Sequence, residues 1–279
     1  MIVRTALLLA ALLSLCAAPP AAAMPVDPPG VLTFGNLART YLLHVPPGLP
    51  PAGLVINLHG AGMTGAQQAA LTNYNAVADR FGFAVAYPDG IDLSWADGRG
   101  ASIPDRQRVD DVGFLAALIE RLTRELAVPP GRVFVTGMSA GGFMANRLAC
   151  DRADLVSAVA PVAGTLGSGV PCAPSRPVSV LAIHGTADAV VPYGGGPMVG
   201  RGGPSDVLSA PALAQRWQQA DGCPAPLVDQ PGPGVQRVAA TGCAGGTEVV
   251  LLSIDGGSHI WPSALDASAA SAQFFAARP

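Results

Sequence analysis

The stretch RVFVTGMSAGGFMANRLA, residues 132–149, decides the fold, because it places a short apolar strand, a glycine-containing turn and a helix in direct succession. The apolar run Val133-Phe134-Val135 is typical of a strand buried in a parallel sheet. A strand that leads straight into a helix is the unit from which parallel sheets covered by helices are built. We therefore expect an α/β fold, with a mostly parallel central sheet and helices on both faces.

The rest of the chain repeats this alternation. We expect strands over residues 39–45, 54–58, 84–87, 132–136, 158–162, 178–183, 235–240 and 248–254, and helices over residues 67–81, 110–126, 141–149, 210–220 and 267–277. Asp110 or Asp111 can cap the second of these helices. Residues 94–108 and 194–204 are expected to be surface loops. No linker or repeat divides the sequence, so residues 24–279 are expected to form one domain.

The composition favours a globular protein with a large core. Half of the 279 residues are hydrophobic and 13% are charged, which argues against disorder. The formal net charge is −3, and there is no basic stripe or acidic tail. The sequence therefore gives no electrostatic basis for a nucleic-acid partner.

Residues 1–23 have the pattern of a signal peptide. Arg4 provides a positive start, residues 6–18 are apolar, and Ala21-Ala22-Ala23 resembles a cleavage site for a signal peptidase. The apolar run is short for a membrane span. We expect an exported protein, extracellular or periplasmic, without stable membrane association after cleavage.

Four cysteines follow the expected cleavage site: Cys150, Cys172, Cys223 and Cys243. An even number in an exported chain indicates two disulfides, for which three connectivities exist. We favour Cys150–Cys172 and Cys223–Cys243, because each bond would close a loop of about 20 residues and contribute about 3 kcal/mol. No C-x-x-C pair is present, which argues against a zinc site.

The segment Gly137-Met138-Ser139-Ala140-Gly141 matches the pattern G-x-S-x-G. Between a strand and a helix this pattern forms a sharp turn that raises the serine Oγ above the carboxyl ends of the strands. Glycine is needed two positions to either side, where a side chain would clash. Ser139 is therefore the candidate nucleophile; the alternative is an incidental serine in a glycine-containing turn.

His259 is the candidate general base, because in this arrangement the order along the chain is Ser, then Asp or Glu, then His. Asp188 is the candidate acid. It follows the strand expected over residues 178–183, and would hold the imidazole in the correct tautomer. Asp206 and Asp221 are rivals by sequence order alone.

An oxyanion hole needs two backbone N–H groups. One is expected from Ala140, directly after the nucleophile. The other is expected from the loop after residues 54–58, where Ala61 is our choice and Gly62 or Met63 are alternatives. His59, in the same loop, is expected to have an architectural role.

Three aromatic residues, Trp95, Trp261 and Tyr193, fall on loops at the expected catalytic edge. We predict them as substrate-binding residues for an aryl or sugar-linked ester, with loop packing as the alternative.

These pieces together resemble the exported esterases grouped as polyhydroxybutyrate depolymerase-like and feruloyl-esterase-like enzymes of the α/β-hydrolase superfamily. The resemblance covers nearly all of residues 24–279. The blocks that carry it, in order, are Leu58-His59-Gly60, Val109 to Phe114, Gly137 to Gly142, Ala160 to Gly164, His184 to Asp188 with Val191-Pro192-Tyr193, and Gly257 to Pro262. The resemblance implies the Ser139–Asp188–His259 triad without metal or organic cofactor, and it supports the sequential disulfide pairing.

We therefore expect a secreted serine carboxylesterase, acting on a feruloyl or acetyl polysaccharide ester or on a hydroxyalkanoate ester. Many polymer-degrading relatives carry a polymer-binding module, and this sequence ends after the last expected helix, which favours soluble esters over a solid polyester. The alternatives are a polyhydroxybutyrate depolymerase proper, a peptidase or lipase on the same scaffold, and a non-catalytic binding protein.

Overall fold

The structure is a computed structural model that describes residues 29–48, 50–263 and 265–278. The expected signal peptide lies outside these residues. The strands are β1 (Pro29–Phe34), β2 (Leu37–His44), β3 (Gly53–Leu58), β4 (Phe83–Pro88), β5 (Val133–Met138), β6 (Ala158–Val162), β7 (Ser179–Gly185), β8 (Gly196–Gly200), β9 (Gly203–Val207), β10 (Leu227–Gly232), β11 (Val235–Ala240) and β12 (Val249–Ile254). The helices are α1 (Gly65–Thr72), α2 (Tyr74–Phe81), α3 (Ile103–Gln107), α4 (Asp111–Glu125), α5 (Ala140–Asp151), α6 (Ala210–Ala220) and α7 (Ala267–Ala276).

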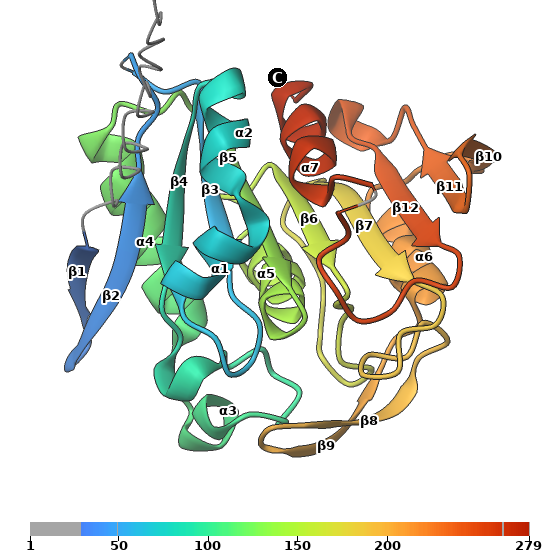
Figure 1. Ribbon diagram of the computed structural model, residues 1–279, viewed down its shortest axis with the longest axis horizontal. Helices are drawn as coiled ribbons and strands as arrows, with labels where there is room; N and C mark the ends of the chain where they lie inside the picture. The colour runs from blue at the N-terminus through green and yellow to red at the C-terminus, as the bar shows by residue number, and fades with distance from the viewer. Residues whose placement is uncertain (1–28, 49, 264, 279) are drawn as a thin grey trace, which may run out of the picture.

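Ten of the described strands form one sheet in the order β1-β2-β4-β3-β5-β6-β7-β12-β11-β10. In Figure 1 the sheet runs from β1 at the left to β10 at the right. The central strands from β4 to β12 pair in parallel, while β1, β2, β11 and β10 pair antiparallel at the two edges. Parallel strands place their carboxyl ends at one edge, where open α/β sheets bind ligands.

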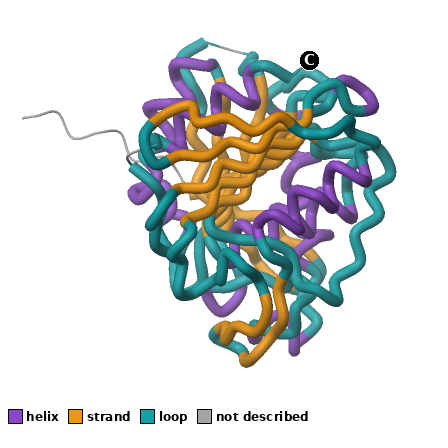
Figure 2. The backbone as a smooth tube through the Cα atoms, turned by 90° about the vertical axis from the view of Figure 1, so that its right-hand side faces the viewer, coloured by secondary structure: helices purple, strands orange, loops and turns teal. Residues whose placement is uncertain are grey.

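Helices cover both faces of this sheet, as Figure 2 shows from the side. On one face α4, α5 and α6 pack through residues such as Phe114, Leu148 and Trp217. On the other face α2 and α7 pack through Tyr74 and Phe275. Strands covered on both faces are mostly apolar, and β3, β4, β6 and β7 are buried at every position. The expected mostly parallel sheet with helices on both faces is confirmed.

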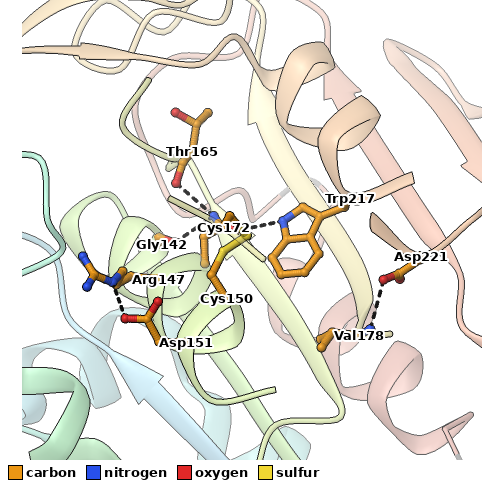
Figure 3. The surroundings of a disulfide bond; sticks show 10 residues. Gly142, Arg147, Cys150, Asp151, Thr165, Cys172, Val178, Trp217 and Asp221 are labelled. Atoms are coloured by element: carbon orange, nitrogen blue, oxygen red, sulfur yellow. Dashed lines mark hydrogen bonds and ion pairs between the residues drawn. A yellow bond between two sulfur atoms is a disulfide. The ribbon is translucent and has the colours of Figure 1, made fainter. Parts of the chain in front are cut away.

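Two disulfides are present, Cys150–Cys172 and Cys223–Cys243, and they are the favoured sequential pairs. The first ties the end of α5 to the segment that follows β6. Figure 3 shows it beside Trp217 of α6, whose Nε1 donates to Asn146 on α5 at 3.1 Å. These contacts tie α5, the helix that begins after Ser139, to α6 and to the segment that follows β6.

Four local expectations were wrong. Residues 67–81 are not one helix: Asn73 adopts a left-handed conformation with φ 45° and separates α1 from α2, which an asparagine tolerates better than most residues. The expected loop over residues 94–108 contains the short helix α3. The expected loop over residues 194–204 is the β8–β9 hairpin. The edge strands β1 and β10 were not expected at all.

Candidate active site

Ser139 lies between β5 and α5 in a strained backbone conformation, with φ 54° and ψ −119°. A positive φ at a non-glycine residue costs on the order of 1–3 kcal/mol and is concentrated at functional sites. The flanking glycines make the turn possible. A Cβ on Gly137 would lie 2.7 Å from the carbonyl oxygen of Leu58, and one on Gly141 would lie 2.1 Å from the same atom. Only glycine fits at these two positions, so the G-x-S-x-G pattern reflects the packing of this turn.

His259 and Asp188 form a hydrogen-bonded pair. Nδ1 of His259 lies 2.8 Å from Oδ2 of Asp188. The two loops that carry them meet where Gly185, the last residue of β7, packs against Gly257: a Cβ on Gly185 would lie 2.2 Å from the Gly257 carbonyl oxygen. The Ala187 N–H donates to that same carbonyl at 2.9 Å. Close backbone packing therefore brings the two side chains together.

The Asp188 carboxylate is buried and fully hydrogen-bonded. Its Oδ1 accepts the backbone N–H groups of Val190 and Val191, each at 2.8 Å, and Nε2 of His184 lies 3.4 Å from Oδ2. Burial raises the pKa of this carboxyl, but the hydrogen bonds from His184, His259 and the two backbone groups outweigh burial and hold the pKa well below its usual range. The carboxylate is thus ionised, and Nδ1 of His259 must be the donor in their hydrogen bond.

Ser139 and His259 line the same cavity, which has a volume of about 270 Å³. Ala61 and Ala140, from which the two oxyanion N–H groups are expected, line it too. The structure therefore brings Ser139, His259, Ala61 and Ala140 to one cavity at the carboxyl edge of the parallel strands, with Asp188 behind His259.

The loop after β3 distinguishes among the three oxyanion candidates. The Gly62 N–H donates to the Leu93 carbonyl at 2.8 Å, and the Met63 N–H donates to the Gly60 carbonyl at 3.2 Å. Within the part of the chain that the structure describes, no acceptor is found for the Ala61 N–H. Ala140 is the first residue of α5, so its N–H has no intrahelical acceptor either. These two N–H groups remain available to an oxyanion.

His59 is buried and holds the loop after β3, the expected oxyanion loop. Its Nε2 accepts the Gly90 N–H at 2.9 Å, so the proton is on Nδ1, which donates to the Gly60 carbonyl at 2.8 Å. Burial lowers the pKa of this imidazole and keeps it neutral. Because the C=O of residue 60 and the N–H of residue 61 point in opposite directions across one planar peptide, this bond fixes the direction of the Ala61 N–H.

The rival acids lie elsewhere. Asp206 is exposed on β9. Asp221 is buried, but it accepts from the Val178 N–H at 3.3 Å, just before β7 begins. That position is at the amino edge of the parallel strands, opposite the edge that carries His259.

The three expected substrate-binding aromatic residues do not line this cavity in the structure as described. Trp95 is fully buried, and its Nε1 donates to the His59 carbonyl at 2.9 Å. Trp261 is 9% exposed and belongs to the core under α7, where Nε1 donates to Ser268 at 3.1 Å. The Tyr193 hydroxyl pairs with Ser253 at 2.7 Å. Each side chain packs its own loop, so none of them is placed for substrate contact here.

The cavity is lined instead by residues that sequence reasoning missed. Phe143 comes from α5, Val190 from the loop of Asp188, Arg99 from the loop before α3, and Met198 to Arg201 from the β8–β9 hairpin. The hairpin residues could not be assigned from the pattern, because the segment was interpreted as a loop.

Asp111 links this region to the sheet. Its buried carboxylate pairs with Arg39 of β2 at 2.7 Å and accepts the Ala96 N–H at 2.7 Å. Asp110 is the N-cap of α4 and accepts from Gly113 at 2.8 Å. Asp111 therefore anchors the loop that carries Arg99, while Asp110 caps α4.

Residues 29–48, 50–263 and 265–278 contain no helix that is both long and apolar enough to cross a membrane. The same residues contain no group of three or more His, Cys, Asp or Glu side chains that could hold a metal ion.

Residues 39–173 match a family model described as "Esterase PHB depolymerase". Among curated relatives, a protein named "Putative esterase NocK" from Nocardia uniformis subsp. tsuyamanensis is 32% identical over 246 residues, which are 80% of this chain and 71% of that protein. Feruloyl esterase B of Piromyces equi is 33% identical over 218 residues, which are 75% of this chain but 39% of that protein.

Among solved structures, an acetyl xylan esterase from Aspergillus awamori superposes with a TM-score of 0.65 over 89% of this chain and 98% of that one, at 16% identity. At that identity the likeness concerns the fold.

Proposed function

Because the chain belongs to the esterase family of PHB depolymerases and has an α/β-hydrolase fold, we propose that it hydrolyses carboxylic esters through a covalent acyl-enzyme on Ser139. His259 is the general base and Asp188 orients it. The observation that carries this proposal is the convergence on one cavity of Ser139 in its strained turn and the His259–Asp188 pair.

In acylation, Ser139 Oγ attacks the ester carbonyl carbon and His259 Nε2 accepts the hydroxyl proton. The negative charge that develops on the carbonyl oxygen is stabilised by the N–H groups of Ala140 and Ala61. The tetrahedral intermediate then collapses. The bond to the alcohol oxygen breaks, and His259 gives its proton to the leaving alcohol.

In deacylation, His259 takes a proton from a water molecule, and the hydroxide attacks the acyl carbon. The second intermediate releases the carboxylic acid, and His259 returns the proton to Ser139 Oγ. Asp188 stabilises the imidazolium in both steps, since its carboxylate stays ionised and accepts from Nδ1.

The cavity favours a compact ester group. Its volume of about 270 Å³ is at the small end for ligand sites, and Phe143, Val190 and Met198 provide an apolar lining. We propose acetyl, feruloyl or short hydroxyalkanoyl esters as the substrate class. Similarity to a feruloyl esterase supports the second of these groups.

We also propose that the protein is exported. The two disulfides support this, because such bonds persist in oxidising compartments. The pattern of residues 1–23 points the same way.

The experiment is ester cleavage by purified protein and by its Ser139→Ala variant. The panel is 4-nitrophenyl acetate, methyl ferulate, acetylated xylan and a polyhydroxybutyrate suspension. Serine-dependent release from ferulate or xylan would assign the plant-polysaccharide esters, and release from the suspension would assign the polyester. Activity retained by Ser139→Ala would refute the proposal.

A further inference from the structure

The β8–β9 hairpin is fixed over the Ser139 cavity. Figure 1 shows it beside α3, below the carboxyl ends of the parallel strands. The Gly202 N–H donates to the Ala101 carbonyl at 2.9 Å, and Arg106 donates to the Gly202 carbonyl. A Cβ on Gly200 would lie 2.7 Å from the Ala101 carbonyl oxygen, and one on Gly202 would lie 2.5 Å from the Ser102 backbone. This close packing sets the position of the residue between the two glycines, Arg201.

Arg201 reaches from the hairpin tip to the oxyanion loop. Its side chain is exposed and lines the cavity of Ser139 and His259. Nη1 lies 3.0 Å from the point where a Cβ on Gly62 would be. The guanidinium therefore lies beside Gly62, the residue after Ala61, from which one oxyanion N–H group is expected.

The other arginine of the cavity, Arg99, is already neutralised. Its Nε and Nη2 form a two-point ion pair with Asp97, at 2.9 and 2.8 Å. Its guanidinium also stacks on the Phe143 ring, 3.5 Å from the centroid, and Nη1 donates to Met198 Sδ at 3.3 Å. All sides of this group are occupied within the protein.

Arg201 has no such partner among the described residues, and no Asp or Glu side chain of that part of the chain lines the cavity. A guanidinium presents a planar set of donors that matches a carboxylate at two points. An unpaired guanidinium beside the reacting groups raises the local concentration of anionic substrate.

We infer that Arg201 binds a carboxylate carried by the ester substrate, so that this site prefers esters with an anionic group close to the scissile bond. The inference rests on the proposed function and deepens it by naming the charge of the substrate class. A free acid on the acyl part and one on the alcohol part offer the same chemistry to Arg201, and the experiment distinguishes them.

The test uses two pairs of esters that differ in charge and little else. For the acyl part, mono-4-nitrophenyl glutarate is compared with 4-nitrophenyl pentanoate. For the alcohol part, 4-acetoxybenzoate is compared with 4-acetoxybenzamide. The readout is the ratio of kcat/KM for the anionic over the neutral member of each pair. It is measured for the wild type, Arg201→Gln, Arg201→Lys and the control Arg80→Gln.

Arg80 is a matched control because it is exposed at the end of α2 and is not part of the cavity lining. Its replacement removes the same net charge from the protein. Any change common to Arg80→Gln and Arg201→Gln would therefore come from the overall charge and not from the cavity.

We expect Arg201→Gln to lower the ratio about five- to tenfold for at least one pair, Arg201→Lys to recover part of it, and Arg80→Gln to leave it unchanged. The wild-type ratio should also fall as NaCl is raised to about 0.5 M. If the wild type cleaves the esters but Arg201→Gln changes the ratio of kcat/KM in neither pair, the inference is overturned while the proposed function stands. Failure of the wild type to cleave any of the four esters would refute the proposed function itself, and the inference with it.

Discussion

Nδ1 of His259 lies 2.8 Å from Oδ2 of Asp188, while the other oxygen of that carboxylate accepts two backbone N–H groups. The two oxygens are therefore not equivalent. Oδ1 accepts from the backbone N–H groups of Val190 and Val191, whose direction the backbone fixes, and Oδ2 faces the imidazole. The ionised carboxylate makes Nδ1 of His259 the donor, and the asymmetry fixes which way an amide would sit in its place, which gives the first prediction.

Asp188→Asn should reverse the tautomer of His259. The amide oxygen must stay toward the N–H groups of Val190 and Val191, so the amide nitrogen would face Nδ1 and force it to become an acceptor. The proton then resides on Nε2, which can no longer take the serine proton. We expect kcat to fall about 10³- to 10⁴-fold with little change in thermal stability. Steady-state kinetics on 4-nitrophenyl acetate measure this, with exposed Asp206→Asn as the control; comparable losses in both variants would contradict it.

His59→Ala should lower kcat about 10- to 100-fold and change KM little. The imidazole does not line the cavity of Ser139 and His259, but it holds the Gly60 carbonyl and thereby the direction of the Ala61 N–H. A misdirected oxyanion donor loses stabilisation that is specific to the transition state. The measurement is the split of the effect between kcat and KM, together with circular dichroism to verify folding. A folded variant with a raised KM and normal kcat would show that His59 does not act through the oxyanion loop.

Gly141→Ala should unfold or strongly destabilise the protein, by about 3 kcal/mol or more. Its Cβ would lie 2.1 Å from the Leu58 carbonyl oxygen, and neither backbone segment can move without disturbing the β3–β5 pairing. Gly169→Ala is the matched control, because no atom lies within 4 Å of its added Cβ. Thermal unfolding of the two variants tests this. A Gly141→Ala protein as stable as Gly169→Ala would refute the packing that we describe for the turn.

Asp221 should make stability depend on pH. Burial raises the pKa of its carboxyl from 3.8 to about 6, since the two hydrogen bonds from Val178 and Thr247 do not offset desolvation. Between pH 3.8 and 6 the folded protein binds a proton that the unfolded chain does not, so this carboxyl adds stability as pH falls through that window and destabilises the fold above it.

Asp221→Asn should therefore gain stability over the wild type at pH 8, and the difference should shrink toward pH 4. The change is on the order of 3 kcal/mol, from a shift of about two pKa units. Thermal unfolding of both proteins across this range measures it. A difference that is independent of pH, or that grows on acidification, would show that Asp221 is not the responsible group.

The triad candidates could be predicted from sequence because each depends on a short, local pattern. Ser139 is flanked by the glycines that its turn needs, and Asp188 and His259 follow apolar strands in the expected order. Parallel strands then bring such loops to one edge whatever the intervening chain does. The elements that carry these residues were predicted within a few residues of their observed bounds.

The walls of the cavity could not be predicted in this way. The β8–β9 hairpin is rich in glycine and proline, and its pairing with the loop of Ala101 is a tertiary contact that leaves no periodic pattern. Trp95 was misinterpreted for a related reason. A polar surrounding sequence indicated an exposed loop, whereas the indole is buried against His59, with ring centroids 4.8 Å apart.

Covalent labelling with a fluorophosphonate tests whether Ser139 is the nucleophile. We expect one added label per protein, located by peptide mass spectrometry on Ser139, and none on Ser139→Ala. Denatured protein should not react, since an unactivated serine is a poor nucleophile. Labelling of Ser94, which also lines the cavity, or equal labelling of wild type and Ser139→Ala, would refute Ser139 as the nucleophile.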